Sequence, residues 1–241
     1  MSGHSKWATT HRAKAIVDAK RGAIFTKLSN IITIAAREKG GDLDTNFTLR
    51  MAVDKAKAAN MPKENVERAI KKGTGELAGA ALEELYYEGV GPANSQFIIK
   101  TLTDNKNRSA AQVRHLFTKA GGALGSVMWN FEKKGEIQIT IESLKEKNIK
   151  IDDLELELIE AGADDIAVED EGVTIYTAIG DLQSVKKLLD TKEIKTESAE
   201  IKFIAKDDLE LSDEDKTRVE NFIDSLDYSD DVADYYTNVN I

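Results

Sequence analysis

The sequence predicts an α+β protein built from three domains, and three observations lead to that fold class. Apolar residues recur at helical spacing through the first 75 positions. From Glu83 onward, short runs of alternating or continuous apolar residues are typical of strands. Residues 136–205 then give the order strand, helix, strand, strand, helix, strand, which is ferredoxin-like. A length of 241 residues also agrees with two or three domains.

The first domain is predicted to be a small helical bundle. The helical spacing over residues 24–35 ends at Gly40. The short polar side chains of residues 44–46 suit the N-cap of a second helix. Pro62 suits the first position of a third helix, and Gly73 suits the left-handed position just after its end.

The middle domain is predicted to contain a sheet with a helix packed on it. Residues 85–87 and 97–102 favour strands on either side of a Gly and Pro turn. Asp104 or Asn107 is a candidate N-cap for the helix that follows. The segment GGALG at 121–125 indicates a turn.

The remaining elements are predicted from position 136 to the C-terminus. Ile137, Ile139 and Ile141 indicate the first strand of the ferredoxin-like domain. After that domain, Ser212 and Asp215 have the spacing of a capping box, which predicts a helix and then a final strand. Because the ferredoxin-like domain closes as a unit, we expect this helix and strand to return to the middle sheet.

The expected domain boundaries follow from these elements. We expect a basic helical domain with a flexible N-terminal tail over residues 1–78. A discontinuous middle domain is expected over 79–132 and 206–241, with a ferredoxin-like domain inserted over 133–205. The fold itself carries no function, so the function has to be sought in side chains.

Charge is distributed unevenly along the chain. Residues 1–75 carry 15 Lys and Arg against 7 Asp and Glu, a net charge of +8, while the remainder carries −18. Residues 206–241 alone hold 12 acidic and 3 basic residues. A basic end on an acidic body is typical of a protein that binds an anionic partner at one end.

The N-terminal tail combines cations with an aromatic residue. Residues 2–22 contain five basic residues and two histidines against one acid, with Trp7 among them. Cations of this kind can neutralise phosphates, while an exposed tryptophan can stack on a base that is not paired. The alternative interpretation of Trp7 is a hydrophobic plug on the helical bundle.

Composition and motifs argue against several classes of function. The absence of cysteine excludes disulfides, thiolate metal sites and cysteine nucleophiles. There is no membrane-length apolar run and no secretory signal, so a soluble cytoplasmic protein is expected. The three histidines form no metal-ligand set, and Ser109 and His115 face apart on their predicted helix. We therefore expect no enzyme, no metal and no cofactor.

Several long motifs in register resemble the YebC/PmpR family and cover nearly the whole chain. They include GHSKW at 3–7, NMPKENVERAIKKG at 60–73, LTDNKNRSAAQVRHLF at 102–117, GGALGSVMWNF at 121–131 and VNI at 239–241. The family includes mitochondrial translational activators, and it has been described both as DNA-binding transcriptional regulators and as ribosomal translation factors. The resemblance implies nucleic acid as a partner. It also implies a discontinuous middle domain.

The chain departs from the family pattern at a few positions. His11, Ala13 and Ala23 stand where the family has Lys, His or Arg, and Phe47 with Thr48 replaces Pro and Arg. Fewer phosphate contacts should weaken binding and its salt dependence. Val90 replaces the tyrosine of the family's EGYGP motif, so no stacking role is transferred to that position.

The sequence thus predicts a non-enzymatic regulator of gene expression that acts as a translation factor on RNA or the ribosome. One alternative is a DNA-binding transcriptional regulator, and another is a protein-interaction adaptor whose acidic body docks basic proteins such as those of the ribosome. The residues expected to bind nucleic acid are Lys6, Trp7, His11, Arg12, Lys14, Lys20, Arg21, Lys27, Lys63, Arg68, Lys71 and Lys72. A possible second contact comprises Arg108, His115, Lys119 and Trp129.

Overall fold

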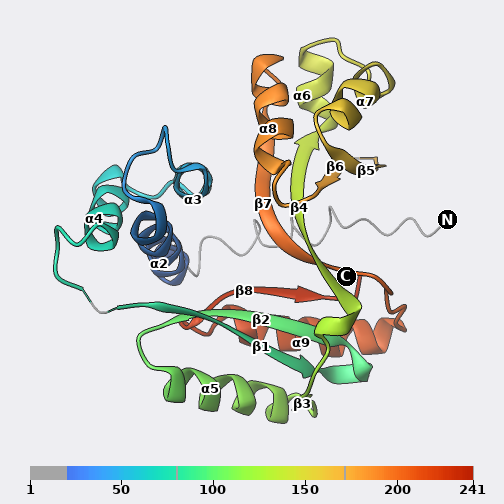
Figure 1. Ribbon diagram of the computed structural model, residues 1–241. Coiled ribbons are helices and arrows are strands. Elements are labelled where there is room, and N and C mark those ends of the chain that lie inside the picture. The colour runs from blue at the N-terminus through green and yellow to red at the C-terminus, as the bar shows by residue number, and fades with distance from the viewer. Residues whose placement is uncertain (1–20, 80, 171, 241) are drawn as a thin grey trace. The chain divides into compact units, whose positions relative to one another are not determined.

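The computed structural model describes residues 21–79, 81–170 and 172–240. These described residues fall into two compact units, one over 132–204 and the other over 21–131 with 205–240. Each unit contains one four-stranded sheet (Figure 1). The predicted α+β class is confirmed. None of the described helices is long and apolar enough to cross a membrane.

The N-terminal part of the described chain is helical, as predicted. Its helices are α2 (Arg21–Lys39), α3 (Phe47–Ala58) and α4 (Lys63–Gly73) (Figure 1). Their buried apolar residues form one core that includes Ile32, Leu49 and Val66. The predicted cap of α3 is confirmed, because Asn46 Oδ1 accepts a hydrogen bond from the Leu49 N–H.

The predicted ends of α4 were wrong by one residue at the N-terminus and by two at the C-terminus. Pro62 is the extended N-cap with ψ 137°, and the helix starts at Lys63. Gly73 is still helical, and the positive φ of +83° occurs two residues later at Gly75. Gly73 is needed for packing, since a Cβ there would lie 2.4 Å from the Thr33 carbonyl oxygen.

The same unit holds the middle sheet. Its strands are β1 (Glu83–Val90), β2 (Gln96–Thr103), β3 (Ala123–Leu124) and β8 (Val232–Thr237), in the order β3-β1-β2-β8. A short 3₁₀ turn at Pro92–Asn94 joins β1 to β2. Strand β8 pairs antiparallel with β2, so the prediction that the chain's last strand completes this sheet is confirmed.

Helices α5 (Lys106–Lys119) and α9 (Asp213–Asp227) share one core with this sheet (Figure 1). Phe97 of β2, Phe117 of α5 and Phe222 of α9 are its largest buried residues, each at most 1% exposed. The rings of Phe97 and Phe222 meet edge to face with centroids 5.0 Å apart. The predicted Ser212 cap of α9 is confirmed, since its Oγ accepts from the Asp215 N–H.

The predicted N-cap of α5 was wrong. The cap is Asn105, and neither Asp104 nor Asn107, because the Asn105 side chain accepts from the Arg108 N–H. The turn predicted at GGALG is present at Gly121, which has φ +78°, and it is followed by the short strand β3, which pairs with β1. Gly122 permits this pairing, since a Cβ at that position would lie 2.2 Å from the Val90 carbonyl oxygen.

The second unit has the predicted ferredoxin-like topology. Its elements are β4 (Phe131–Thr140), α6 (Ile141–Glu146), α7 (Ile151–Glu160), β5 (Ala163–Val168), β6 (Gly172–Thr177), α8 (Leu182–Thr191) and β7 (Thr196–Ala205). The sheet order is β5-β6-β4-β7. Ile141, predicted in the first strand, instead starts α6, because Thr140 caps that helix by accepting from the Ser143 N–H.

Candidate nucleic-acid interface

Helix α4 presents four of the predicted phosphate-binding residues. Val66 and Ala69 are buried against the helical core. The cations on the remaining surface are exposed, and they are Lys63, Arg68, Lys71 and Lys72. Glu67 partly offsets them, with one carboxylate oxygen 3.5 Å from the Lys63 Nζ. An exposed ion pair of this kind is weak, so Lys63 can exchange its partner for a phosphate at little cost.

The position of α4 is fixed by close contact with α2. The Thr33 hydroxyl donates to the Ala69 carbonyl oxygen at 3.1 Å. Gly73 brings the end of α4 against the backbone of Thr33, where a side chain would collide. The four cations are therefore carried on a helix whose position is set by its packing.

Lys27 of α2 has a different environment from the α4 cations. Its side chain is half-buried, and its Nζ donates to the Asp227 carbonyl oxygen at 3.0 Å. This contact lies within the larger unit and occupies one of the three donors of the ammonium group. A phosphate bound by Lys27, as predicted, would have to share the ammonium group with this carbonyl oxygen.

Other exposed cations lie at the ends of the neighbouring helices. The last turn of α2 carries Arg37 and Lys39, and the last turn of α3 carries Lys55 and Lys57. All four are exposed. They were not among the predicted site residues, because basic residues in a last turn also complement the helix dipole and are common for that reason alone. They add four exposed basic residues to the helical part of the chain.

The remaining predicted residues of the N-terminal segment lie outside the described residues. This applies to Lys6, Trp7, His11, Arg12, Lys14 and Lys20. Arg21 is the first residue of α2, but the structure describes only its backbone and not its side chain. Their predicted roles stay predictions.

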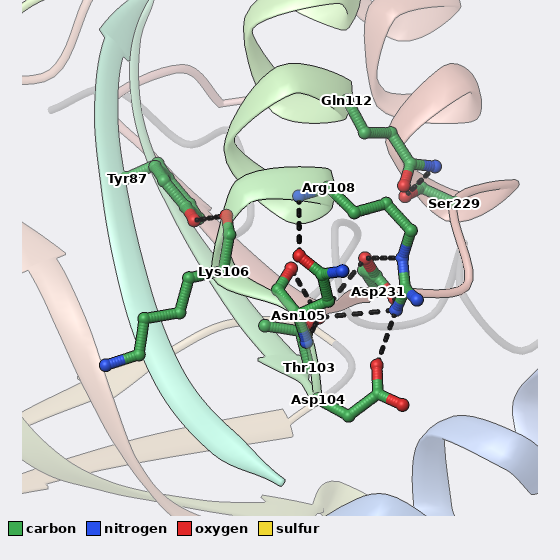
Figure 2. Close-up of polar contacts among 9 residues, drawn as sticks. All are labelled: Tyr87, Thr103, Asp104, Asn105, Lys106, Arg108, Gln112, Ser229 and Asp231. Atoms are coloured by element: carbon green, nitrogen blue, oxygen red, sulfur yellow. Dashed lines mark hydrogen bonds and ion pairs between the residues drawn. The ribbon is translucent and has the colours of Figure 1, made fainter.

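Arg108, predicted in the second contact, takes part in an ion-pair network (Figure 2). Its Nη2 lies 3.0 Å from Asp231 Oδ1, and its Nε donates to Asp231 Oδ2 at 3.3 Å. Nη2 also lies 2.9 Å from Asp104 Oδ1. Hydrogen bonds to Asp231 and then to Asp104 raise the pKa of Arg108. Two carboxylates thus compensate its charge, so a phosphate at Arg108 would compete with them.

The other members of the α5 surface are exposed. His115 and Lys119 both face solvent on α5. Gln112 Nε2 donates to the Ser229 Oγ at 2.9 Å, which adds to the connection between α5 and the segment before β8 (Figure 2). Ser109 is fully buried while His115 is exposed, so these two residues form no nucleophile and base pair. The described residues include no group of His, Asp and Glu that could hold a metal ion.

Trp129, the last residue of the predicted second contact, is exposed, with 63% of its area accessible. It lies in a 3₁₀ turn, Met128–Asn130, after the small-residue segment. The Glu88 carboxylate anchors one side of this turn. Its Oε2 accepts from the N–H groups of Val127 and Met128, both at 2.7 Å.

Asn130 anchors the other side of the turn. Its Nδ2 donates to Gln96 Oε1 and to the Asp207 carbonyl oxygen, and its Oδ1 accepts from the Asp207 N–H. The Lys206 N–H donates to the Asn130 carbonyl oxygen at 2.7 Å, and the Lys206 Nζ donates to the Trp129 carbonyl oxygen. Trp129 is therefore presented by a turn whose backbone is held on both sides, while its own ring remains exposed.

Two family models together match nearly the whole chain. A family model described as the TACO1/YebC protein N-terminal domain matches residues 5–76. A second model, the TACO1/YebC second and third domain, matches residues 82–239. The chain belongs to the TACO1/YebC family. The two matched segments meet between α4 and β1, so the helical part corresponds to the family's N-terminal domain.

Relatives in the family are similar over their full length. A probable transcriptional regulatory protein of Thermoanaerobacter pseudethanolicus is 48% identical over 244 residues, covering 100% of this chain and 98% of the relative. A probable transcriptional regulatory protein of Chlorobaculum parvum is 47% identical, with 100% and 96% covered. Both relatives are named as probable transcriptional regulatory proteins.

A solved structure has the same fold. The crystal structure of a conserved hypothetical protein from Aquifex aeolicus matches with a TM-score of 0.81 and 39% sequence identity. The match covers 93% of this chain and 92% of that one. The three-part α+β architecture is therefore shared with this solved relative.

Proposed function

We propose that this member of the TACO1/YebC family regulates gene expression by binding nucleic acid through the basic surface of its helical part. The observation that carries the proposal is the set of exposed cations on α4, extended by the last turns of α2 and α3. Exposed Lys and Arg on packed helices provide phosphate contacts that position a protein without reading base sequence. Helices α2 and α4 are held together by the Thr33 and Gly73 contacts, which favours a surface of fixed shape.

Within that function we propose RNA, presented by the ribosome, as the partner. The exposed Trp129 ring supports this choice, because stacking on an aromatic ring needs bases that are not paired, and RNA loops offer them. The acidic C-terminal part supports it as well. A long duplex would be repelled by 12 acidic residues against 3 basic ones in residues 206–241, whereas basic ribosomal proteins would be attracted.

A DNA-binding transcriptional regulator is the second candidate function. The names of the relatives favour it, since they are given as probable transcriptional regulatory proteins. The same α4 cations would neutralise phosphates of a duplex. An adaptor that docks basic proteins on the acidic surface is the third, favoured by Asp213, Glu214 and Asp215 in the first turn of α9.

The proposed use of the basic surface is tested by the salt dependence of binding. A variant with Lys63, Arg68, Lys71 and Lys72 changed to Ala should bind single-stranded RNA more weakly. Its log–log salt slope should be shallower by about 3, from roughly 0.7 per lost phosphate contact. Fluorescence anisotropy at several salt concentrations measures both quantities.

The matched control removes four exposed lysines from the ferredoxin-like unit. Lys145, Lys150, Lys187 and Lys195 are exposed there, and their change to Ala lowers the net charge by the same amount. The control should keep the wild-type slope. An α4 variant that also kept it would remove the helical surface from the mechanism.

The partner is tested by competition between ribosomes and duplex DNA. We expect the protein to cosediment with ribosomes at near-physiological salt and to be displaced from duplex DNA by excess ribosomes. Binding to a specific duplex that survives excess ribosomes, without cosedimentation, would favour the transcriptional function. Cosedimentation that the α4 variant retains would favour the adaptor.

A further inference from the structure

Helix α7 of the ferredoxin-like unit carries apolar side chains on two opposite sides (Figure 1). Leu154 and Leu158 are buried on its inner side. Leu156 lies two positions from each of them, about 160° around the helix, and so points outward. It is 73% exposed, the highest value among the large apolar side chains that the structure describes. Ile159 follows three positions later, next to Leu156 on the helix surface, and is 53% exposed.

The fold does not require this outer apolar pair. Helix α8 is the corresponding helix of the second half of the unit. Its buried residues are Leu182, Val185 and Leu189, whereas its exposed side includes the polar Gln183 and Lys187. A surface helix is normally polar on its outer side in this way. Adjacent exposed apolar side chains framed by polar ones are instead typical of an interaction site.

The frame around the apolar pair is acidic. Helix α7 contains five acidic residues and no basic one. Glu157 pairs with the Lys192 Nζ of α8 at 2.8 Å. The other four are exposed and pair with no cation of the described residues, and they are Asp152, Asp153, Glu155 and Glu160. At about 100° per residue, Glu155 lies on one side of the apolar pair, while Asp153 and Glu160 lie on the other. We call these four acids with Leu156 and Ile159 the α7 outer face.

We propose that the α7 outer face docks a cationic amphipathic helix of a partner protein. Apolar side chains of the partner cover Leu156 and Ile159, and Lys or Arg on both of its flanks pairs with the carboxylates. Charged residues beside an apolar seam set the choice of partner and its orientation when two helices pack together. The ten residues of α7 span about 15 Å, which matches two to three turns of such a helix.

The acidic frame argues against other occupants. A symmetric dimer would use the same patch on both copies and bring their carboxylates together. Like charges in contact oppose association. The phosphates of a nucleic acid would be repelled in the same way. The inference goes beyond the proposed function, because it concerns a protein partner and a unit other than the one that carries the α4 cations.

A synthetic helical peptide with Leu along one side and Lys on both flanks tests the apolar contact. Fluorescence anisotropy of the labelled peptide measures its binding to the full chain. The variant Leu156→Ser with Ile159→Ser should bind about tenfold more weakly or worse, from the lost burial of two side chains. The matched control is Leu77→Ser with Ile179→Ser, since these residues are 41% and 46% exposed. It should bind like the wild type, and circular dichroism checks that both variants are folded.

A charge variant tests the acidic frame. Asp153→Asn, Glu155→Gln and Glu160→Gln together should weaken binding and reduce its dependence on salt. The control changes three exposed acids of α9, with the substitutions Asp213→Asn, Glu214→Gln and Asp224→Asn. It should keep the wild-type affinity. A charge variant that loses affinity while the Leu156 and Ile159 variant keeps it would indicate non-specific attraction and overturn the proposal, as would an equal loss in the α9 control.

Alkylation locates the bound peptide, because the chain has no cysteine of its own. The peptide should slow alkylation of Asp152→Cys severalfold and leave Gln183→Cys on α8 unchanged. Equal protection at both positions would overturn the proposal. So would an absence of binding to the wild-type chain, whether the face is bare or already covered by another part of the chain.

Two further measurements separate this proposal from its alternatives. Analytical ultracentrifugation should show that the Leu156 and Ile159 substitutions leave the oligomeric state unchanged. A dimer that these substitutions abolish would assign the face to a second copy and overturn the proposal. The same variant should bind single-stranded RNA like the wild type, so this docking surface and the proposed nucleic-acid surface can fail independently of each other.

Discussion

The guanidinium of Arg108 holds the carboxylate of Asp231 with two hydrogen bonds, although 123 residues separate them in the sequence. Asp231 directly precedes β8, and Arg108 lies in the first turn of α5. The pair therefore connects the chain's last strand to the helix that follows β2. It helps to close a sheet whose strands come from distant parts of the sequence.

The two carboxylates around Arg108 should contribute unequally to stability. Asp231→Ala is expected to lower the midpoint of thermal unfolding more than Asp104→Ala does. The Asp231 side chain is 12% exposed and connects two elements, whereas Asp104 is 44% exposed and pairs within one turn. Circular dichroism melting curves of the two variants provide the comparison. Equal midpoints would show that the Asp231 bonds add nothing beyond a local pair.

Asn46 should be among the most sensitive polar positions of the helical part. It is fully buried, and besides capping α3 its Nδ2 donates to the carbonyl oxygens of Ala35 and Gly40. Asn46→Ala should cost about 2–4 kcal/mol in urea unfolding, from a lost cap plus carbonyl groups left without partners.

Substitutions that preserve only the cap separate the two roles of Asn46. Asn46→Asp keeps an oxygen that accepts from the Leu49 N–H. It replaces the donating Nδ2 with a second oxygen, which faces the carbonyl oxygens of Ala35 and Gly40 and cannot donate to them. It should therefore remain strongly destabilising, as should Asn46→Ser. A wild-type stability for Asn46→Asp would mean that the cap alone matters.

Tyr86 should make stability fall at alkaline pH. Burial raises the pKa of Tyr86, and the hydrogen bond from its hydroxyl to Glu84 raises the pKa further. The folded state thus retains the proton to higher pH than the unfolded chain, whose tyrosines ionise near pH 10. The stabilisation is complete below about pH 10 and is lost as pH rises toward the folded pKa.

Urea unfolding at increasing alkaline pH measures this effect. Tyr86→Phe should remove the part of the pH dependence that belongs to Tyr86. Tyr228→Phe is the control, since Tyr228 is 70% exposed. Identical pH profiles for the wild type and Tyr86→Phe would contradict the linkage.

Trp129 should contribute to RNA affinity through stacking. Trp129→Ala is expected to weaken binding of single-stranded RNA by about 1–3 kcal/mol for one stacked base. The salt slope should stay unchanged, because no phosphate contact is lost. Tyr228→Ala removes another exposed aromatic ring and should have no effect. Wild-type affinity for Trp129→Ala would exclude the turn from the interface.

The ferredoxin-like unit should fold without the rest of the chain. A fragment of residues 133–205 contains every strand of its sheet except the first residues of β4, so cooperative thermal unfolding is expected. The fragment should not bind RNA. A fragment that ends at residue 195 lacks β7 and serves as the comparison. Failure of 133–205 to unfold cooperatively would argue against the proposed boundaries of the inserted domain.

Local sequence patterns were sufficient to predict the position of most helices and strands. The caps at Asn46 and Ser212 depend on bonds to residues three positions away, and such bonds are visible in a linear sequence. Ile141 was misplaced because apolar alternation continues through it, while the Thr140 cap ends the strand. Strand β3 was missed because two residues are too few to show a period.

The candidate site was less accessible to sequence reasoning. The exposure of the α4 cations follows from helical spacing, so these residues were predicted. The contacts of Lys27 with Asp227 and of Arg108 with Asp231 join residues 200 and 123 positions apart, and no local pattern contains them. A sequence shows which residues are cationic, but tertiary packing decides which of them form hydrogen bonds or ion pairs within the protein.

The hydrogen bonds of Asn130 have a consequence for the evolution of this architecture. They join Asn130, just before the inserted unit, to residues 206 and 207, just after it, 77 positions later at Asp207. The two ends of the insertion are therefore hydrogen-bonded to each other. Loop-closure entropy grows slowly, by about 0.6 kcal/mol for each doubling of length. Insertions or deletions between these two stretches should therefore be tolerated by the parent sheet.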